Sequence, residues 1–293
     1  MTGYGRDTTP ELAKRHDIAV FEADACGTST AVSVPCMFSG LGKSGYSRQA
    51  ALERENLLDV LHHAGWQVVW SDNNTGDQNV ARRIGWTHPE TSLAPEACKR
   101  ECTDEIFLPV IEKTAREITQ NTVLVLHMIG SHGPAYFLRY PLKRAAFQPD
   151  CRTSQFSDCS PEEIVNAYDN TIRETDHELA QSMDILAASD RVLPALVYLS
   201  DHGESLGENG LYLHAAPSFM APAEQTKVPM LLWSAPQFDQ ALGRGAICAA
   251  PPKDKAVSHD NLLPTLLALL DIDTSLRRDD LDLSAACQNG DKP

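Results

Sequence analysis

The sequence predicts an α/β domain, specifically an α/β/α sandwich in which helices cover both faces of a mainly parallel central sheet. Short apolar runs rich in β-branched residues alternate with helical patterns along the chain, as buried parallel strands and their crossover helices do. The 293 residues contain no internal repeat and no linker-like tract. These two observations favour one domain over residues 1–293 rather than two.

The elements follow in chain order from their residue patterns. Five runs have the length and composition of buried strands: Ile18–Phe21, Gln67–Trp70, Thr122–His127, Leu196–Ser200 and Pro229–Trp233. Helical patterns lie between them, at Arg48–Ala64, Glu105–Ile118, Pro161–Ala188 and His259–Leu270. Gly65 ends the first of these helices and Ser258 caps the last. Ligands of such folds bind outside the carboxyl ends of the strands, so we expect chemistry just after strands.

Charge and hydropathy exclude several function classes. Forty acidic and 25 basic residues give a net charge of −15, and no Lys/Arg cluster is present. A nucleic-acid partner is therefore excluded, and a phosphate-bearing substrate needs a metal or a helix N-terminus to supply positive potential. The longest apolar candidate, Asn261–Ile272, is too short for a membrane span and contains Pro264. Residues 1–10 have no apolar core and do not form a signal peptide.

The eight cysteines indicate disulfides. They fall into three close pairs and a remaining pair: Cys26 with Cys36, Cys98 with Cys102, Cys151 with Cys159, and by elimination Cys248 with Cys287. A zinc site is the alternative, but three residues separate Cys98 from Cys102 and no second pair stands at a zinc-ribbon spacing. Disulfides indicate an oxidising compartment.

The segment after the strand Leu196–Ser200 has the composition of a metal site. Asp201 and His202 follow the strand directly, Glu204 comes two residues later, and His214 lies further along. A carboxylate with an imidazole suits zinc or manganese. The alternative is a solvated acidic loop with a satisfied histidine.

Two other segments follow strands in the same way. His132 lies in a Gly/Pro loop after the strand Thr122–His127, where it can contact a ligand, whereas His127 is better explained as a strand-end residue satisfied by a neighbour. Three hydroxyls, at Thr28, Ser29 and Thr30, precede an apolar helix-like stretch. One of these hydroxyls can serve as the N-cap of the helix, and one can serve as a nucleophile at the helix N-terminus. Different hydroxyls can fill the two roles.

Four motifs follow one another along nearly the whole chain. They are Cys26-Gly-Thr-Ser-Thr-Ala-Val-Ser-Val-Pro-Cys36-Met-Phe-Ser39, Trp70-Ser-Asp72-Asn-Asn74, His127-Met-Ile-Gly-Ser-His132-Gly-Pro-Ala-Tyr136, and Ser200-Asp-His-Gly-Glu-Ser-Leu-Gly-Glu-Asn-Gly-Leu-Tyr-Leu-His214. In this order they resemble the phosphoethanolamine transferases that modify lipid A, a family that includes the mobile colistin-resistance enzymes.

The resemblance implies an alkaline-phosphatase-like fold, shared with sulfatases, and dependence on Zn²⁺. Thr30 is implied as the nucleophile that carries phosphoethanolamine and also touches the zinc, with Asp201 and His202 as metal ligands. His132 and His214 are implied to hold the donor or acceptor phosphate, or a second zinc, with Glu204 as their acidic neighbour. The three close cysteine pairs agree with disulfides of the family.

The resemblance also implies how the chain relates to a longer protein. In the family, the segment matching Thr2–Pro10 follows a buried strand that ends in Gly-Glu-Thr-Arg, whose glutamate is a zinc ligand, and a transmembrane domain precedes that strand. This sequence begins at the matching segment. We therefore expect one periplasmic, sulfatase-like catalytic domain, 1–293, that lacks the first strand and the N-terminal transmembrane domain.

The implied reaction of the parent protein is transfer of phosphoethanolamine from phosphatidylethanolamine to a lipid A phosphate, at the periplasmic face of the bacterial inner membrane. This lowers the negative charge of the outer membrane and its binding of polymyxin. Three alternatives stay open: an inactive truncated chain that at most binds metal or phosphate, a transferase for another glycan acceptor, and a sulfatase. A sulfatase needs a Cys/Ser-x-Pro-x-Arg run, in which neither Ser33 nor Cys36 stands. We expect a monomer.

Overall fold

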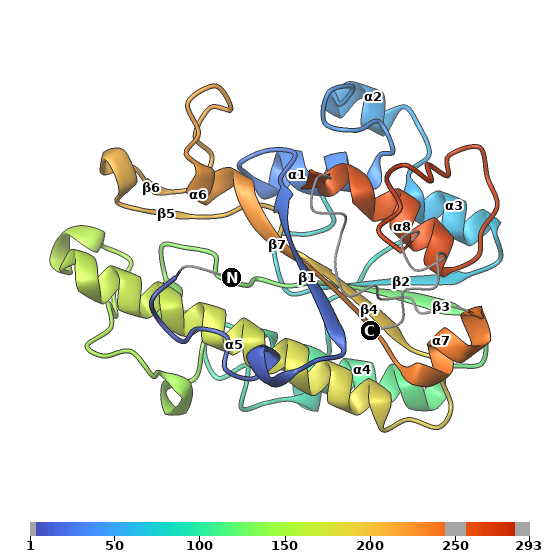
Figure 1. Cartoon of the computed structure of the whole chain (residues 1–293). Coiled ribbons are helices and arrows are strands. Elements are labelled where there is room, and N and C mark those ends of the chain that lie inside the picture. Colours follow the sequence, from blue (N-terminus) through green and yellow to red (C-terminus); the bar gives the residue numbers. More distant parts are fainter. Residues whose placement is uncertain (1–3, 244–255, 285–293) are drawn as a thin grey trace.

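A mixed four-stranded sheet forms the centre of the fold. The computed structural model describes residues 4–243 and 256–284, and Figure 1 shows their arrangement. The strand order is β4-β7-β1-β8. β7 runs antiparallel to both β1 and β4, whereas β8 runs parallel to β1. β1 and β4 therefore point in the same direction. These strands are β1 (Ile18–Asp24), β4 (Ala195–Leu199), β7 (Lys227–Ser234) and β8 (Val257–Ser258).

Two smaller sheets accompany this central one. β2 (Gln67–Asp72) and β3 (Thr122–His127) form a parallel pair. A short antiparallel hairpin, β5 (Ser205–Leu206) with β6 (Tyr212–Leu213), follows β4. Within the described ranges β3 pairs only with β2, and β4 pairs only with β7. Each of these two strands thus has one edge without a strand partner.

Helices cover both faces of the strands, as the sequence predicts (Figure 1). On one face, Leu57 and Leu267 pack in one cluster with Trp70 of β2. On the other face, Met183 packs against Trp233 of β7. The helices are α1 (Thr30–Phe38), α2 (Arg48–Leu52), α3 (Leu57–His63), α4 (Phe107–Glu117), α5 (Pro161–Ala187), α6 (Ala223–Thr226), α7 (Pro236–Leu242) and α8 (Leu262–Leu269).

The five predicted strands are all present, but the sheet is less parallel than expected. The chain leaves β4 at its carboxyl end, forms the β5–β6 hairpin and α6 beside that end, and then enters β7 from the same side. A strand that the chain enters from this end runs antiparallel to β4, because no crossover helix carries the chain back to the amino-terminal end of β4.

One predicted helix is divided in two. The pattern over Arg48–Ala64 forms α2 and α3, which are separated by residues 53–56. Asn56 causes the second start, because its side chain accepts hydrogen bonds from the backbone N–H groups of Leu58 and Asp59, while Asp59 accepts one from the Asn56 backbone. Such a capping box begins a new helix rather than continuing an existing one. None of the helices in the described part of the chain has the length and apolar character needed to cross a bilayer.

α5 carries a buried acidic residue that faces the interior. Both carboxylate oxygens of Glu178 are buried without a hydrogen-bond partner, and the Arg144 guanidinium lies 3.9 Å away. Arg144 instead donates to Glu174 and Glu105. Burial, followed by the negative charges of Glu174 and Asp104, raises the pKa of Glu178 to about 9. Glu178 therefore holds its proton at neutral pH in the folded state.

We expect Glu178→Gln to become increasingly stabilising as pH rises from 5 to 8. The unfolded chain releases the Glu178 proton above the ordinary pKa of 4.5, whereas the folded chain retains it up to about 9, so the wild type loses stability across this range. The gap in unfolding free energy between variant and wild type should widen by about 1 kcal/mol per pH unit. Urea unfolding at pH 5, 6.5 and 8 measures it, with the exposed Glu112→Gln as control. A gap independent of pH would contradict the neutral buried acid.

Candidate functional site

The candidate site forms where the loops after β1 and β4 meet. Because β1 and β4 point in the same direction, their carboxyl ends lie on the same side of the sheet, at the ends of its strands. Thr30 is the first residue of α1, and its Oγ1 lies 3.2 Å from Nε2 of His202, just beyond β4. Both residues are buried. The predicted nucleophile and one predicted metal ligand are thus in contact.

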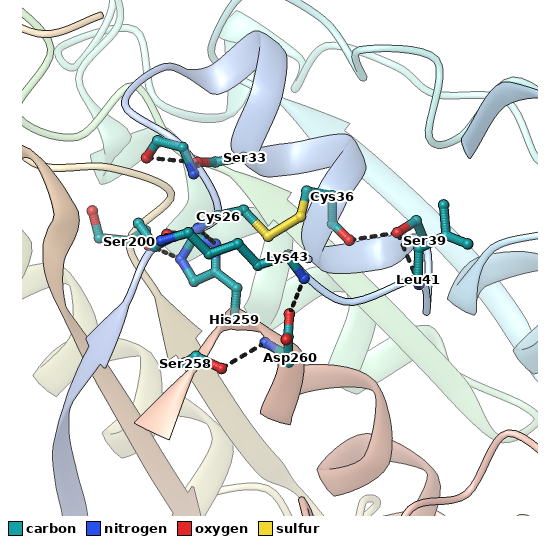
Figure 2. The surroundings of a disulfide bond; sticks show 12 residues. Cys26, Ser33, Cys36, Ser39, Leu41, Lys43, Ser200, Ser258, His259 and Asp260 are labelled. Carbon is teal, nitrogen blue, oxygen red and sulfur yellow. Dashed lines mark hydrogen bonds between the residues drawn. A yellow bond between two sulfur atoms is a disulfide. The ribbon is translucent and has the colours of Figure 1, made fainter. Parts of the chain in front are cut away.

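The start of α1 is held by bonds that leave the Thr30 hydroxyl available. Ser29 occupies the N-cap position but makes no capping hydrogen bond through its side chain. Ser33, one turn into the helix, instead ties down the preceding loop: its Oγ accepts from the Gly27 N–H and donates to the Gly27 carbonyl. The Cys26–Cys36 disulfide joins the same loop to the helix (Figure 2).

His259 fastens the two loops to each other, and the sequence patterns did not single it out. Its Nδ1 accepts from the Cys26 N–H at 3.0 Å, and its Nε2 donates to the Ser200 carbonyl at 3.0 Å (Figure 2). Burial lowers the pKa of His259 to about 4, so the ring is neutral and can accept on one nitrogen while donating on the other. The predicted Ser258 cap is confirmed, but that pattern indicates only a helix start.

Asp201 and His202 present potential metal-ligand atoms close to each other. The His202 Nδ1 donates to the Gly203 carbonyl, which leaves the Nε2 lone pair directed at Thr30. Asp201 Oδ1 accepts from the His202 backbone, whereas Oδ2 is buried without a hydrogen-bond partner and lies 3.6 Å from His202 Nε2. An orphaned buried carboxylate oxygen beside a free imidazole nitrogen and a hydroxyl fits a divalent cation of the zinc type.

The other three predicted residues lie beside this group. The His214 ring centre lies 4.4 Å from that of His202 and 4.9 Å from that of His132. Potential ligand atoms of His202, Glu204 and His214 lie within 4.8 Å of one another. The structure thus brings together all six residues that the sequence nominates outside the cysteines.

Each histidine of the cluster is oriented through Nδ1. His132 donates to the Gly133 carbonyl at 2.7 Å, and His214 donates to Glu204 at 2.9 Å. Such bonds fix the ring so that Nε2 faces the ligand, the arrangement that metal-bound histidines commonly use. The hydrogen bond to Glu204 raises the pKa of His214, whereas burial and then the charge of His214 lower that of His132.

Glu204 is committed to contacts within the protein. Besides His214, it accepts from the Gly133 N–H and from the Tyr136 hydroxyl. These bonds connect the loop after β4 to the loop after β3. Its place beside the histidines agrees with the acidic neighbour expected from the sequence.

The loop that carries His132 is held by a buried carboxylate. Asp104 accepts from the Ile129 and Gly130 N–H groups and from the Asn73 side chain. His127 Nδ1 contacts Asp72 at 2.7 Å, as expected for a strand-end residue with a neighbouring partner, whereas its Nε2 is buried without a hydrogen-bond partner. Burial alone would raise the pKa of Asp72, but hydrogen bonds from His127 and Trp70 lower it to about 2.

Three of the four predicted disulfides are confirmed. They join Cys26 to Cys36, Cys98 to Cys102 and Cys151 to Cys159. Cys248 and Cys287 lie outside the described residues, so their pairing stays a prediction.

A cavity of about 1150 Å³ extends from this site into the core. Every residue of β3 and β4 lines it, and all are only half-buried. Thr30, Asp201 and His202 lie on its wall at the candidate site, and both helical layers contribute apolar side chains further in. The cavity follows the two strand edges that have no strand partner.

Comparisons with known proteins identify the family of the chain. The chain matches the Sulfatase family model over residues 1–272. It is 38% identical over 291 residues to Phosphoethanolamine transferase EptA of Escherichia coli K12, covering 98% of this chain and 53% of that protein. It is also 38% identical over 282 residues to Phosphatidylethanolamine transferase Mcr-1 of Escherichia coli, covering 93% and 51%. The chain thus spans about half the length of the curated relatives it matches.

A solved structure has the same fold. The soluble domain of lipooligosaccharide phosphoethanolamine transferase A from Neisseria meningitidis matches with a TM-score of 0.90 at 39% identity, covering 97% of this chain and 87% of that one. An integral membrane protein of that name from the same organism matches equally well over 54% of its chain.

The fold is therefore alkaline-phosphatase-like. The chain belongs to the sulfatase family, and its relatives within that family are phosphoethanolamine transferases. The resemblance found in the sequence motifs is confirmed.

We expect His259→Ala to lower the free energy of unfolding by about 2–4 kcal/mol, because it leaves the Cys26 N–H and the Ser200 carbonyl without their partner inside the core. Denaturant unfolding measures this, with the exposed His62→Ala as the matched control. Equal loss in both variants would contradict the bridging role of His259.

Proposed function

We propose that this domain catalyses transfer of phosphoethanolamine from phosphatidylethanolamine to a lipid A phosphate. The observation that carries the proposal is the contact of Thr30 at a helix N-terminus with His202, beside the orphaned carboxylate oxygen of Asp201. The names of the relatives in the preceding section support the same reaction class.

We further propose zinc as the cofactor, held by Thr30, Asp201 and His202. The hydroxyl, carboxylate and imidazole form a donor set that zinc accepts. When bound, zinc would supply the positive charge that favours loss of the Thr30 proton and offsets the charge of the substrate phosphate. The protein itself has a net charge of −15 and offers little positive potential of its own.

The transfer divides into two displacements on the protein's own hydroxyl. In the first, the Thr30 oxygen forms a bond to the donor phosphorus and gives up its proton to water, while the bond to diacylglycerol breaks. His214, which Glu204 orients through Nδ1, would give the diacylglycerol oxygen a proton. In the second, a lipid A phosphate oxygen attacks the same phosphorus and the Thr30 oxygen leaves, regaining a proton from water. His132 and His214 hold the phosphate in both halves.

We also propose that, in the active enzyme, a further strand occupies the central cavity and runs parallel to β3 and β4. The cavity follows the unpaired edges of β3 and β4, and the buried polar atoms of Asn74, His127, Glu178 and Asp201 line it without hydrogen-bond partners. A strand there would pair with both edges and join the two sheets. The family strand that ends in Gly-Glu-Thr-Arg is the segment whose glutamate would then reach the metal site.

The second candidate is a domain that works without that strand only as a binding module. Such a domain is inactive as a transferase and at most binds metal or phosphate. The half-buried residues of β3 and β4 favour this alternative for the described residues, 4–243 and 256–284, taken alone. We propose that the parent protein acts as a monomer at the periplasmic face of the inner membrane, in agreement with the three disulfides. Transfer to another glycan acceptor would use the same Thr30 chemistry.

We expect incubation with phosphatidylethanolamine to place one phosphoethanolamine on Thr30. Mass spectrometry of tryptic peptides detects the adduct, which should be absent from Thr30→Ala and present in Ser29→Ala, whose hydroxyl makes no capping bond. An adduct that persists in Thr30→Ala would remove Thr30 as the nucleophile. Turnover of an aryl sulfate without any adduct would instead indicate a sulfatase.

Adding such a strand to this chain should strengthen zinc binding. We expect a chain extended at its N-terminus by an apolar strand ending in Gly-Glu-Thr-Arg to bind zinc at least ten-fold more tightly and to unfold at higher temperature, since a fourth ligand and new sheet pairing are gained. Zinc calorimetry and thermal unfolding measure both effects. Asp201→Ala should weaken zinc binding in either form. Equal zinc affinity of the two chains, unchanged by Asp201→Ala, would mean that the metal site lies elsewhere.

A further inference from the structure

The segment between β6 and α6 is unusually apolar for so acidic a protein. Residues 211–223 include no Asp, Glu, Lys or Arg, although the chain has a net charge of −15. Within this segment Phe219 is 89% exposed and Met220 is 55% exposed. Phe219 is the most exposed of the large apolar side chains in residues 4–243 and 256–284. Figure 1 shows the segment as an orange loop that projects beside α6, away from the sheet.

Backbone hydrogen bonds attach this loop to the segment that carries Thr30. The Ala215 N–H donates to the Thr28 carbonyl at 2.7 Å, and the Thr28 hydroxyl donates to the Ala216 carbonyl at 2.7 Å. Thr28 lies two residues before Thr30. The base of the loop is therefore fixed next to the candidate nucleophile.

A buried glutamine holds the same base from the other side. Gln225 accepts from the Ala216 N–H, and its amide donates to Ser205 and to the Leu213 carbonyl. Both ends of the loop are thus bonded to the protein, and the exposed Phe219 and Met220 lie between these attachment points. Exposed apolar side chains displayed in this way mark an interaction surface.

We infer that residues 217–222 form a lipid-contact loop, in which Phe219 and Met220 enter the interfacial region of the bilayer that holds the donor. The inference rests on the proposed function, because a lipid donor keeps its acyl chains in the bilayer and the site must therefore approach the membrane surface. Aromatic and flexible apolar side chains suit the interfacial region. The missing charge suits it too, since an acidic segment would be repelled by anionic lipids.

The membrane is favoured over a protein partner by what surrounds the loop. His214 and Thr30 bind the phosphate in the proposed reaction, and both lie at the base of the loop, where a lipid headgroup has to be presented. The loop therefore positions the bilayer and determines access by lipid donors, without taking part in the chemistry.

Vesicle flotation tests the inference with the full chain and zwitterionic vesicles of phosphatidylcholine and phosphatidylethanolamine. We expect the double variant Phe219→Ser/Met220→Ser to reduce the vesicle partition coefficient by about ten-fold or more, because two apolar side chains no longer leave water. The matched control is Leu193→Ser, since Leu193 is 56% exposed but precedes β4, at the opposite end of that strand from Asp201. Its partition should equal that of the wild type.

The outcomes separate this inference from the proposed function. Thr30→Ala should bind vesicles like the wild type, and the double variant should still form the Thr30 adduct with a short-chain, water-soluble donor. Loss of vesicle binding in the double variant with no adduct in any protein would contradict the proposed function and leave the lipid-contact loop standing. Three results would overturn the inference that residues 217–222 contact lipid. They are a wild type that does not bind vesicles, a double variant that binds vesicles as well as Leu193→Ser does, and a wild-type dimer that the double variant abolishes.

Discussion

The candidate site depends on one pairing constraint, the position of β7 between β1 and β4. Because β7 is antiparallel to both, the two flanking strands point in the same direction. Thr30 follows β1, and Asp201 and His202 follow β4, so all three lie near the carboxyl ends of these strands. β8 is parallel to β1, so His259 emerges on that side of the sheet as well. Backbone hydrogen bonding within the sheet thus brings together residues that are up to about 230 positions apart in the sequence.

Bonds between loops then fix the geometry that the sheet begins. His259 links the loops after β1 and β4, and Glu204 links the loops after β4 and β3. All of these groups are buried, where an unpaired polar atom is costly, so the loops are bound to one arrangement. Asn74, His127, Glu178 and Asp201 each have a buried atom without a partner, and all four lie on the central cavity, where a metal ion and a further strand are proposed.

Much of this could be predicted from the sequence because the signals were local. Strand composition located all five main strands, and close spacing identified three disulfides. The direction of β7 could not be read in this way, since it is set by which side the chain enters the sheet from. The division of Arg48–Ala64 depended on one capping side chain, Asn56, within an otherwise helical pattern. His259 was missed because both of its partners are distant in sequence.

The most direct test of the site is a zinc-soaked crystal of the chain, examined by anomalous scattering at the zinc edge. The proposed site predicts a peak bonded to Asp201, His202 and the Thr30 hydroxyl, at about 2.0–2.2 Å. A peak found only at the separate group of carboxylates formed by Glu105, Glu174 and Glu178 would contradict the proposed site. A peak bound by His132 and His214 without Thr30 would likewise show that the hydroxyl and the metal do not share one centre.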